Sequence, residues 1–187
     1  MKNLFLAAIA VFTIGATSAQ DMKFGAKAGL NLANISGDSD NSVRTAFYVG
    51  GLAEIKISDK FAFQPELLYS SQGSVSKSIS DVSVQFDYLN IPLMAKYMVA
   101  EGFNLEVGPQ IGILLASKVK ASSVSVDFKE FTNTVDFGLN FGAGYEINEN
   151  LEIGARYGLG FTNVLKDTVT KIDNKNSVIQ IGVAFKF

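Results

Sequence analysis

Large apolar residues alternate with small or polar residues along most of this chain. The pattern is clearest at the C-terminus, where single small or polar residues separate Ile179, Ile181, Val183, Phe185 and Phe187. A period of two residues is typical of a β-strand with one apolar face. Comparable runs predict eight strands, at residues 22–33, 45–57, 61–72, 82–99, 103–119, 134–147, 151–163 and 177–187.

The predicted connections alternate between short and long. Three of them contain only three residues each, at 58–60, 100–102 and 148–150. The others are longer and rich in Ser, Asp, Asn and Lys, at 34–44, 73–81, 120–133 and 164–176. Short turns on one side and long loops on the other are typical of an outer-membrane barrel, and an even number of strands returns both chain ends to the short-turn side. The fold class predicted is therefore all-β, an eight-stranded antiparallel up-and-down transmembrane β-barrel.

One predicted strand changes phase. In residues 82–99 the apolar positions Phe86 and Tyr88 are followed by Leu89 and Ile91, which would face the opposite side of a regular strand. We therefore expect a β-bulge near Tyr88 and Leu89 that keeps the apolar side chains on one face. Further irregularities are expected at the prolines within predicted strands, because proline cannot donate to a β-ladder: Pro65, Pro92 and Pro109.

The first residues have the features of a cleavable signal peptide. Lys2 precedes an apolar stretch from Leu4 to about Ala16, and small residues follow up to Ala19. The stretch is too short to span a bilayer comfortably, and a buried N-terminal helix is the alternative. We predict a signal peptide at residues 1–19, cleavage between Ala19 and Gln20, and a barrel domain at residues 20–187 of an exported protein.

Charge and aromatic positions favour a membrane barrel over a soluble one. The polar face would carry Lys27, Glu54, Glu66, Lys96, Glu106, Glu146 and Arg156, together with Lys23, Lys56, Glu152 and Lys186. These charges could fill a narrow lumen as mutually compensating ion pairs. One predicted aromatic belt lies beside the short turns, and contains Phe24, Phe61, Phe63, Tyr97, Phe103, Tyr145, Phe185 and Phe187. The other lies toward the loops, and contains Phe47, Tyr69, Phe86, Phe137 and Phe161. A soluble barrel around an apolar ligand and a β-sandwich remain alternatives, because both also show alternation.

Several segments resemble the outer-membrane β-barrel domain family of Bacteroidota that is often labelled PorT-like. They are QPELLYSSQG (64–73), YLNIPLMAKY (88–97), GPQIGILLASK (108–118), GAGYEI (142–147) and the closing FKF (185–187). The resemblance covers essentially the whole chain after the signal peptide. It implies an outer-membrane location, insertion by the barrel assembly machinery, and a C-terminal strand that serves as the assembly signal. The label comes from a secretion accessory protein, a role that similarity of fold does not transfer.

The composition excludes many catalytic sites. The chain contains no cysteine and no histidine, which removes disulfides, thiolate metal sites, cysteine nucleophiles and histidine bases. The sequence SGDSDN (36–41) lacks the ligand series of a calcium loop. GAGYEI and GLGFTN (158–163) are not followed by a helix, as a dinucleotide site requires. Carboxylate pairs such as Glu54 with Glu66 or Glu106 with Glu146 are better explained as structural ion pairs than as an acid and a base. We predict no enzyme, no metal and no cofactor.

The expected partners follow from the fold. With 16 basic and 18 acidic side chains, the chain shows no basic patch for nucleic acid. We expect a monomer that contacts outer-membrane lipid, and the barrel assembly machinery during insertion. Its role would be structural or carried by an external loop partner that the sequence does not identify. The alternatives are a soluble or periplasmic barrel that binds an apolar ligand, and an accessory factor of protein secretion.

Overall fold

The structure is a computed structural model that describes residues 22–36, 41–77, 82–121, 124–166 and 173–187. The predicted signal peptide and its cleavage between Ala19 and Gln20 lie outside these residues.

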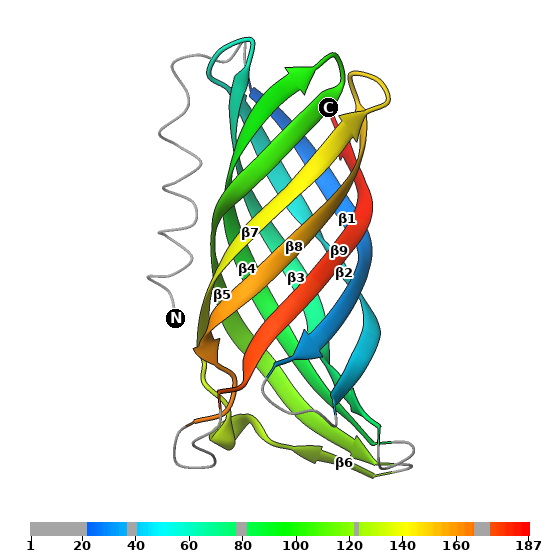
Figure 1. Cartoon of the computed structure of the whole chain (residues 1–187), viewed down its shortest axis with the longest axis vertical. Helices are drawn as coiled ribbons and strands as arrows, with labels where there is room; N and C mark the ends of the chain where they lie inside the picture. The colour runs from blue at the N-terminus through cyan, green and yellow to red at the C-terminus, as the bar shows by residue number, and fades with distance from the viewer. Residues whose placement is uncertain (1–21, 37–40, 78–81, 122–123, 167–172) are drawn as a thin grey trace.

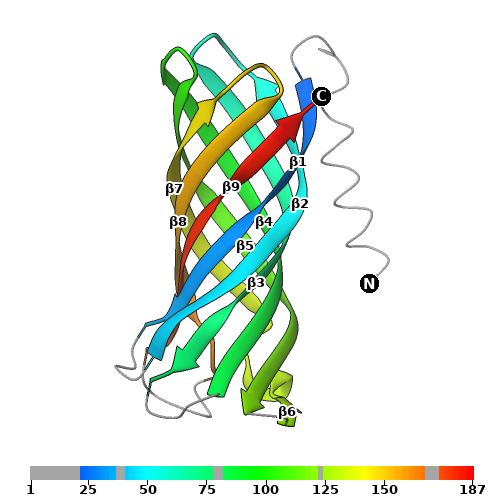
Figure 2. The same ribbon diagram turned by 90° about the vertical axis from the view of Figure 1, so that its right-hand side faces the viewer.

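Eight long strands form a closed antiparallel barrel, as the alternation predicts (Figure 1, Figure 2). They are β1 (Met22–Ile35), β2 (Asn41–Lys56), β3 (Phe61–Ser76), β4 (Val82–Ala100), β5 (Phe103–Ala121), β7 (Val135–Glu146), β8 (Leu151–Asn163) and β9 (Lys175–Lys186). Each strand pairs with its neighbours in sequence, and β9 closes the barrel by pairing with β1 from Gly25↔Lys186 to Ile35↔Asn176. The last strand is therefore part of the barrel wall, and its pairing with β1 leaves no exposed sheet edge of the kind that an open sheet would have.

The two ends of the barrel differ as expected. The short turns, the start of β1 and the C-terminus lie at one end, which we call the turn end (Figure 1). The long connections lie at the other end, the loop end. Here β2 and β3 extend beyond their predicted limits, to Asn41 and Ser76. Backbone pairing continues there through serine-rich sequence that has no alternating apolar residues, so periodicity did not reveal it.

A ninth strand and a short helix lie within the predicted loop at residues 120–133. Strand β6 (Val124–Asp127) pairs with the end of β5, from Lys118↔Asp127 to Ala121↔Val124, and the 3-10 helix η1 (Lys129–Phe131) follows it. We call residues 118–121 and 124–131 the β5–β6 arm, which extends past the loop end of the barrel (Figure 1). No helix in the described part of the chain has the length and apolar character of a membrane span.

The outer surface carries the large apolar side chains. Leu30, Leu105, Phe141 and Ile181 are 44–56% exposed, as expected where a barrel wall faces lipid. Ring pairs occur near both ends, Phe61 with Tyr97 at the turn end and Phe47 with Tyr69 toward the loop end, at centroid distances of 4.9 and 5.7 Å. The apolar face points outward, which contradicts the alternative of a soluble barrel that encloses an apolar ligand.

The β-bulge predicted near Tyr88 and Leu89 does not turn the side chains of Phe86 and Tyr88 to the outer face. A register shift does lie between Asp87 and Tyr88, but it belongs to the β4–β5 pairing, where Leu115 of β5 is the extra residue. Strand β4 itself pairs with β3 without a shift in this region. Phe86 and Tyr88 therefore face inward and are each 1% exposed, so Phe86 does not belong to the outer aromatic belt. These two rings close the loop end of the lumen, where burial makes an inward apolar cluster favourable.

The prolines also leave the register intact. Pro65 pairs with Leu93, Pro92 with Gln110 and Pro109 with Leu139, with no register shift at these positions. The predicted irregularity is limited to gaps in the pairing beside two of them, since the β3–β4 ladder passes from Pro65 to Leu68 and the β4–β5 ladder from Pro92 to Ala95. Each proline removes one donor without adding a residue to its strand.

Two adjacent glycines of β2 offer a test of the tight packing between strands. A Cβ atom at Gly50 would overlap the backbone oxygen of Leu67, whereas at Gly51 its nearest neighbour would be the backbone oxygen of Gly25 at 3.7 Å. We expect Gly50→Val to prevent formation of the closed barrel and Gly51→Val to permit it. The measurement is the fraction of refolded protein that migrates faster in SDS before boiling. Equal fractions for the two variants would contradict this account.

Candidate functional site in the barrel lumen

A cluster of two ammonium groups and three carboxylates fills the lumen near the turn end. Lys186 Nζ lies 3.1 Å from Glu54, 2.6 Å from Glu146 and 3.2 Å from Glu152. Lys96 Nζ lies 2.8 Å from Glu54 and 2.7 Å from Glu152. We call these five residues the turn-end cluster. It joins β2, β4, β7, β8 and β9 across the barrel.

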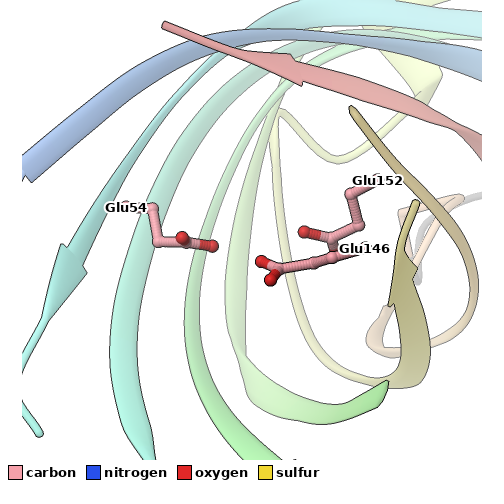
Figure 3. A group of neighbouring side chains, drawn as sticks. All are labelled: Glu54, Glu146 and Glu152. Carbon is pink, nitrogen blue, oxygen red and sulfur yellow. The ribbon is translucent and has the colours of Figure 1, made fainter. Parts of the chain in front are cut away.

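The three carboxylates of this cluster point toward one another (Figure 3). Their oxygens lie within 4.8 Å of one another, a spacing that could hold a metal ion. However, the ammonium group of Lys186 contacts all three carboxylates, and that of Lys96 contacts two of them. The arrangement is therefore a hydrogen-bonded ion-pair cluster in which lysine supplies the positive charge that a metal would otherwise bring.

Arg156 forms the centre of a second cluster, nearer the middle of the barrel. Its guanidinium binds Glu66 through two hydrogen bonds of 2.9 Å, and binds Glu106 through two of 2.8 and 3.0 Å. Lys27 Nζ adds a contact of 3.2 Å to Glu66. Arg156 is 4% exposed, so both of its bidentate pairs are shielded from water, where charge-assisted hydrogen bonds are strong. We call these four residues the Arg156 cluster.

Gln64 links the two clusters. Its amide nitrogen donates to Glu66 at 2.6 Å, and its amide oxygen accepts from Lys96 Nζ at 3.2 Å. Through Gln64 the network includes side chains from all eight strands of the barrel.

Strand alternation explains how these residues meet, and glycine explains how they fit. Gly142 lies directly opposite Arg156 in the β7–β8 pairing. A Cβ atom at Gly142 would lie 3.0 Å from Glu106 Oε1, so the missing side chain leaves room for the arginine and its partners. The spacing of glycine and long charged residues on the polar face is the sequence signal of this packing.

The structure brings together the seven charged residues singled out from the sequence, which are Lys27, Glu54, Glu66, Lys96, Glu106, Glu146 and Arg156. Glu152 and Lys186, expected on the same face, complete the turn-end cluster. Lys56 and Lys23 were also expected there but lie outside it. Lys56 pairs with Asp59 at 3.2 Å in an exposed contact, and Lys23 donates to the backbone oxygen of Glu149. Both lie at the rim of the turn end, where water replaces the lumen.

Uncharged amides follow above the Arg156 cluster, toward the loop end. Gln180 donates to Asn31 at 3.0 Å, Asn31 donates to Ser70 at 2.9 Å, and Asn140 donates to Gln110 at 3.0 Å. The sequence places these residues in predicted strands, but alternation does not predict which uncharged side chains bond to one another across the lumen. Above it, an apolar cap closes the lumen and consists of Ile35, Phe86, Tyr88, Leu114 and Val164.

The apolar residues of the predicted assembly strand lie on the outer face of β9. Ile179, Ile181, Val183, Phe185 and Phe187 are 43–72% exposed, while Gln180 and Lys186 point into the lumen. The same strand therefore contributes to the lipid-facing wall and to both polar layers of the interior.

Comparison with known proteins agrees with this geometry. Residues 18–166 match the family described as Outer membrane protein beta-barrel domain. Neisserial surface protein A (NspA) is similar in structure with a TM-score of 0.58 and 12% identity, over 89% of this chain and 97% of that chain. Ail, the attachment invasion locus protein of Yersinia pestis, has a TM-score of 0.53 and 14% identity, over 90% of this chain and 100% of that chain. At these identities the likeness shows the fold alone. The search of curated proteins found no significant match.

Proposed function

This chain belongs to the outer membrane protein beta-barrel domain family and is an integral β-barrel protein of the outer membrane, and we propose that it acts there as a non-catalytic scaffold. In this proposal the filled barrel is a rigid support, and contacts made at the loop end carry the biological role. The observation that supports it most directly is the ion-pair network that spans the lumen.

A filled lumen favours a scaffold over a pore. Eight-stranded barrels have an interior just wide enough for side chains, whereas aqueous channels come with about 16–18 strands. Here the turn-end cluster, the Arg156 cluster, the amide layer and the apolar cap follow one another along the barrel axis. A solute would have to break several buried ion pairs to pass.

The environment of the carboxylates favours a structural role over a catalytic one. Each carboxylate of the two clusters is held by at least one lysine or arginine. A general acid or base needs a proton that it can exchange with a substrate within hydrogen-bond reach. Glu66 is 3% exposed and Glu106 is 6% exposed, so neither presents that proton to a ligand.

The β5–β6 arm is the surface that we assign to partner contacts. It carries the exposed side chains of Val126 and Phe131, which are 54% and 47% exposed. The rings of Phe128 and Phe131 contact each other in a tilted arrangement, with their centroids 4.8 Å apart. An aromatic pair on a projecting hairpin offers apolar contact area on a rigid base. Outer-membrane lipid, the barrel assembly machinery during insertion and a monomeric state belong to the same proposal. The PorT-like assignment within the family stays a prediction from the sequence segments that resemble it.

The proposal predicts that the purified protein forms no open channel. In planar lipid bilayers we expect no stepwise conductance, because the two ion-pair clusters, the amide layer and the apolar cap together fill the lumen. A 16-stranded porin inserted in the same way is the positive control, and heat-dependent gel mobility verifies that the protein is folded. Stepwise ion conductance by the folded monomer would contradict the proposal and favour a transport role.

A loop-exchange variant separates the scaffold from the contact surface. Replacing residues 122–130 with a short turn should leave heat-dependent mobility and thermal stability nearly unchanged, because neither cluster uses these residues. The exchange keeps Thr132 and Asn133, which bond to Ser117 and to the backbone oxygen of Asn163. Loss of the folded form would show that the arm supports the barrel and would count against its assignment as a contact surface.

A further inference from the structure

A small polar cavity lies in the lumen between the Arg156 cluster and the apolar cap. Its internal volume is about 20 Å³, and its lining includes Asn90, Gln110, Asp136, Asn140 and Asn176. A buried site needs about 10–15 Å³ of such volume to hold a water molecule, so this cavity has room for one molecule of that size. It belongs to neither ion-pair cluster, and the proposed scaffold function does not depend on it.

Three polar atoms of the lining residues are buried and have no hydrogen-bond partner in the described part of the chain. Two are acceptors, Asp136 Oδ1 and Asn176 Oδ1, and one is a donor, Asn90 Nδ2. Asn90 is 1% exposed and Asn176 is 5% exposed, so bulk water does not reach these amides. Because buried polar groups in folded proteins are almost always hydrogen-bonded, the three atoms call for a common ligand.

The chemistry of these three atoms defines the ligand. It must donate two hydrogen bonds, to Asp136 and Asn176, and accept one, from Asn90. A metal cation or an ammonium ion has no lone pair to accept the hydrogen bond of Asn90 Nδ2, and an anion would be repelled by the Asp136 carboxylate. Water can donate two hydrogen bonds and accept two, and a buried water typically makes about three. Size and hydrogen-bonding capacity therefore select the same molecule.

We propose that this cavity is a specific binding site for one water molecule, which donates to Asp136 Oδ1 and Asn176 Oδ1 and accepts from Asn90 Nδ2. The three residues lie on β4, β7 and β9, and no two of these strands are neighbours in the barrel. Asn176 Nδ2 already donates to Asp136 Oδ2 at 2.9 Å, and the water adds β4 to this pair. It therefore links three strands across the lumen, above the level at which the ion pairs do so.

A glycine preserves the space that the water needs. Gly158 lines the cavity, and a Cβ atom there would lie 2.7 Å from Asn140 Oδ1. Asn140 is 2% exposed and its Nδ2 donates to Gln110 at 3.0 Å, so its amide cannot move aside freely. A methyl group at residue 158 would therefore take space from the cavity. Tyr88 of the apolar cap lies beside this group of residues, with its hydroxyl 3.4 Å from Asn176 Nδ2.

Nuclear Overhauser contacts between water and the side-chain amide of Asn90 test the proposal directly. Deuterated, ¹⁵N-labelled protein is refolded into lipid nanodiscs in ordinary water, and rotating-frame spectra separate dipolar contacts from proton exchange. We expect a dipolar cross-peak between the Asn90 Nδ2 protons and the water resonance, because an enclosed water exchanges slowly. Tyr88→Phe removes a nearby hydroxyl whose exchanging proton would give the same signal, and this variant should keep the cross-peak.

Two glycine variants of β8 locate the water in the cavity. Gly158→Ala adds a methyl group to the lining, and should abolish the cross-peak and lower the melting temperature. Gly154→Ala is the matched control on the same face of the same strand, because residue 154 lies outside the lining and its Cβ atom would lie 3.3 Å from the nearest atom, the backbone oxygen of Ala143. This control should keep the cross-peak.

Two results would overturn the proposal. They are the absence of the cross-peak from the folded wild type, and its persistence in Gly158→Ala. Loss of the cross-peak in Tyr88→Phe would assign the signal to the tyrosine hydroxyl and would also count against a bound water. The spectra of the wild type and of Tyr88→Phe decide the question even if Gly158→Ala does not refold.

Discussion

Replacing Arg156 with methionine is expected to lower the free energy of unfolding by about 3–5 kcal/mol. Methionine fills much of the same volume, so the change removes charge rather than packing. It leaves Glu106 buried without its cation, and leaves Glu66 with only Lys27 at 3.2 Å. The measurement is the urea unfolding midpoint of protein refolded into lipid vesicles, with gel mobility as the readout for the folded barrel.

Two controls separate this effect from a general effect of losing positive charge. Lys166→Met removes a lysine at the loop end, whose Nζ donates to the backbone oxygen of Glu130 in an exposed contact. Lys56→Met removes the exposed partner of Asp59. Both should change stability by less than about 1 kcal/mol, the usual value of a surface pair. If all three variants shift the midpoint equally, the interior ion pairs are not what stabilises the barrel.

A rescue variant tests the pairing itself. Combining Arg156→Met with Glu106→Gln removes one positive and one negative charge, and keeps Glu66 with Lys27 and Gln64. Removing both charges of a buried pair is often nearly neutral, whereas removing one is strongly destabilising. The double variant should therefore recover much of the stability lost in Arg156→Met. Additive losses would show that Arg156 acts by packing alone.

The sequence predicted the barrel because one simple pattern controls it. A lipid-facing residue such as Leu105 and a lumen residue such as Glu106 must alternate wherever the wall separates lipid from a narrow interior. The positions of the strands and the outward direction of the apolar side chains follow from that requirement. The same pattern placed the charges of the polar face together, although it could not state which carboxylate meets which lysine.

Pairing partners depend on strand register and tilt, which alternation does not contain. Arg156 and Glu66 are 90 residues apart, and their contact requires all of the intervening strands to be in register. The prediction failed where the barrel stops being a boundary between lipid and a charged lumen. At the loop end Phe86 and Tyr88 are apolar yet face inward, and Leu115 adds one residue to β5. Alternation assigned Phe86 and Tyr88 to the outer face because apolar residues occur on both faces of the strand there.

The β5–β6 arm and a small polar cavity of the lumen, lined by Asn90, Asp136 and Asn176 among others, were missed for a related reason. Strand β6 has only four residues and pairs with one neighbour, the end of β5, so its short alternation did not stand out from a polar loop. Asp136 and Asn176 occupy ends of strands, where isolated short polar residues usually indicate turns. Only the three-dimensional arrangement shows that these residues share one buried space.

Shortening the side chain of the last residue, Phe187→Ala, is expected to reduce assembly in cells while leaving the purified barrel stable. Phe187 is 72% exposed, and its structural contact is a backbone hydrogen bond of 2.8 Å to Phe24, which alanine keeps. The Phe187 side chain, which belongs to the predicted assembly strand, therefore contributes little to the folded state. The measurement is the amount of fast-migrating, unboiled protein in the outer-membrane fraction, compared with the same protein refolded in vitro.

Lys186→Met provides the opposite case on the neighbouring residue. Lys186 is 1% exposed and contacts Glu54, Glu146 and Glu152, so its loss should destabilise the refolded barrel in vitro, where no assembly machinery is present. Phe161→Ala, which removes an exposed ring (60%) at the other aromatic belt, is the control for a general loss of lipid contact. If Phe187→Ala assembles as well as Phe161→Ala, the terminal ring is not an assembly signal. If instead Phe187→Ala and Lys186→Met destabilise the refolded barrel equally, the outer face of the last strand does not serve assembly separately from the stability that its lumen face provides.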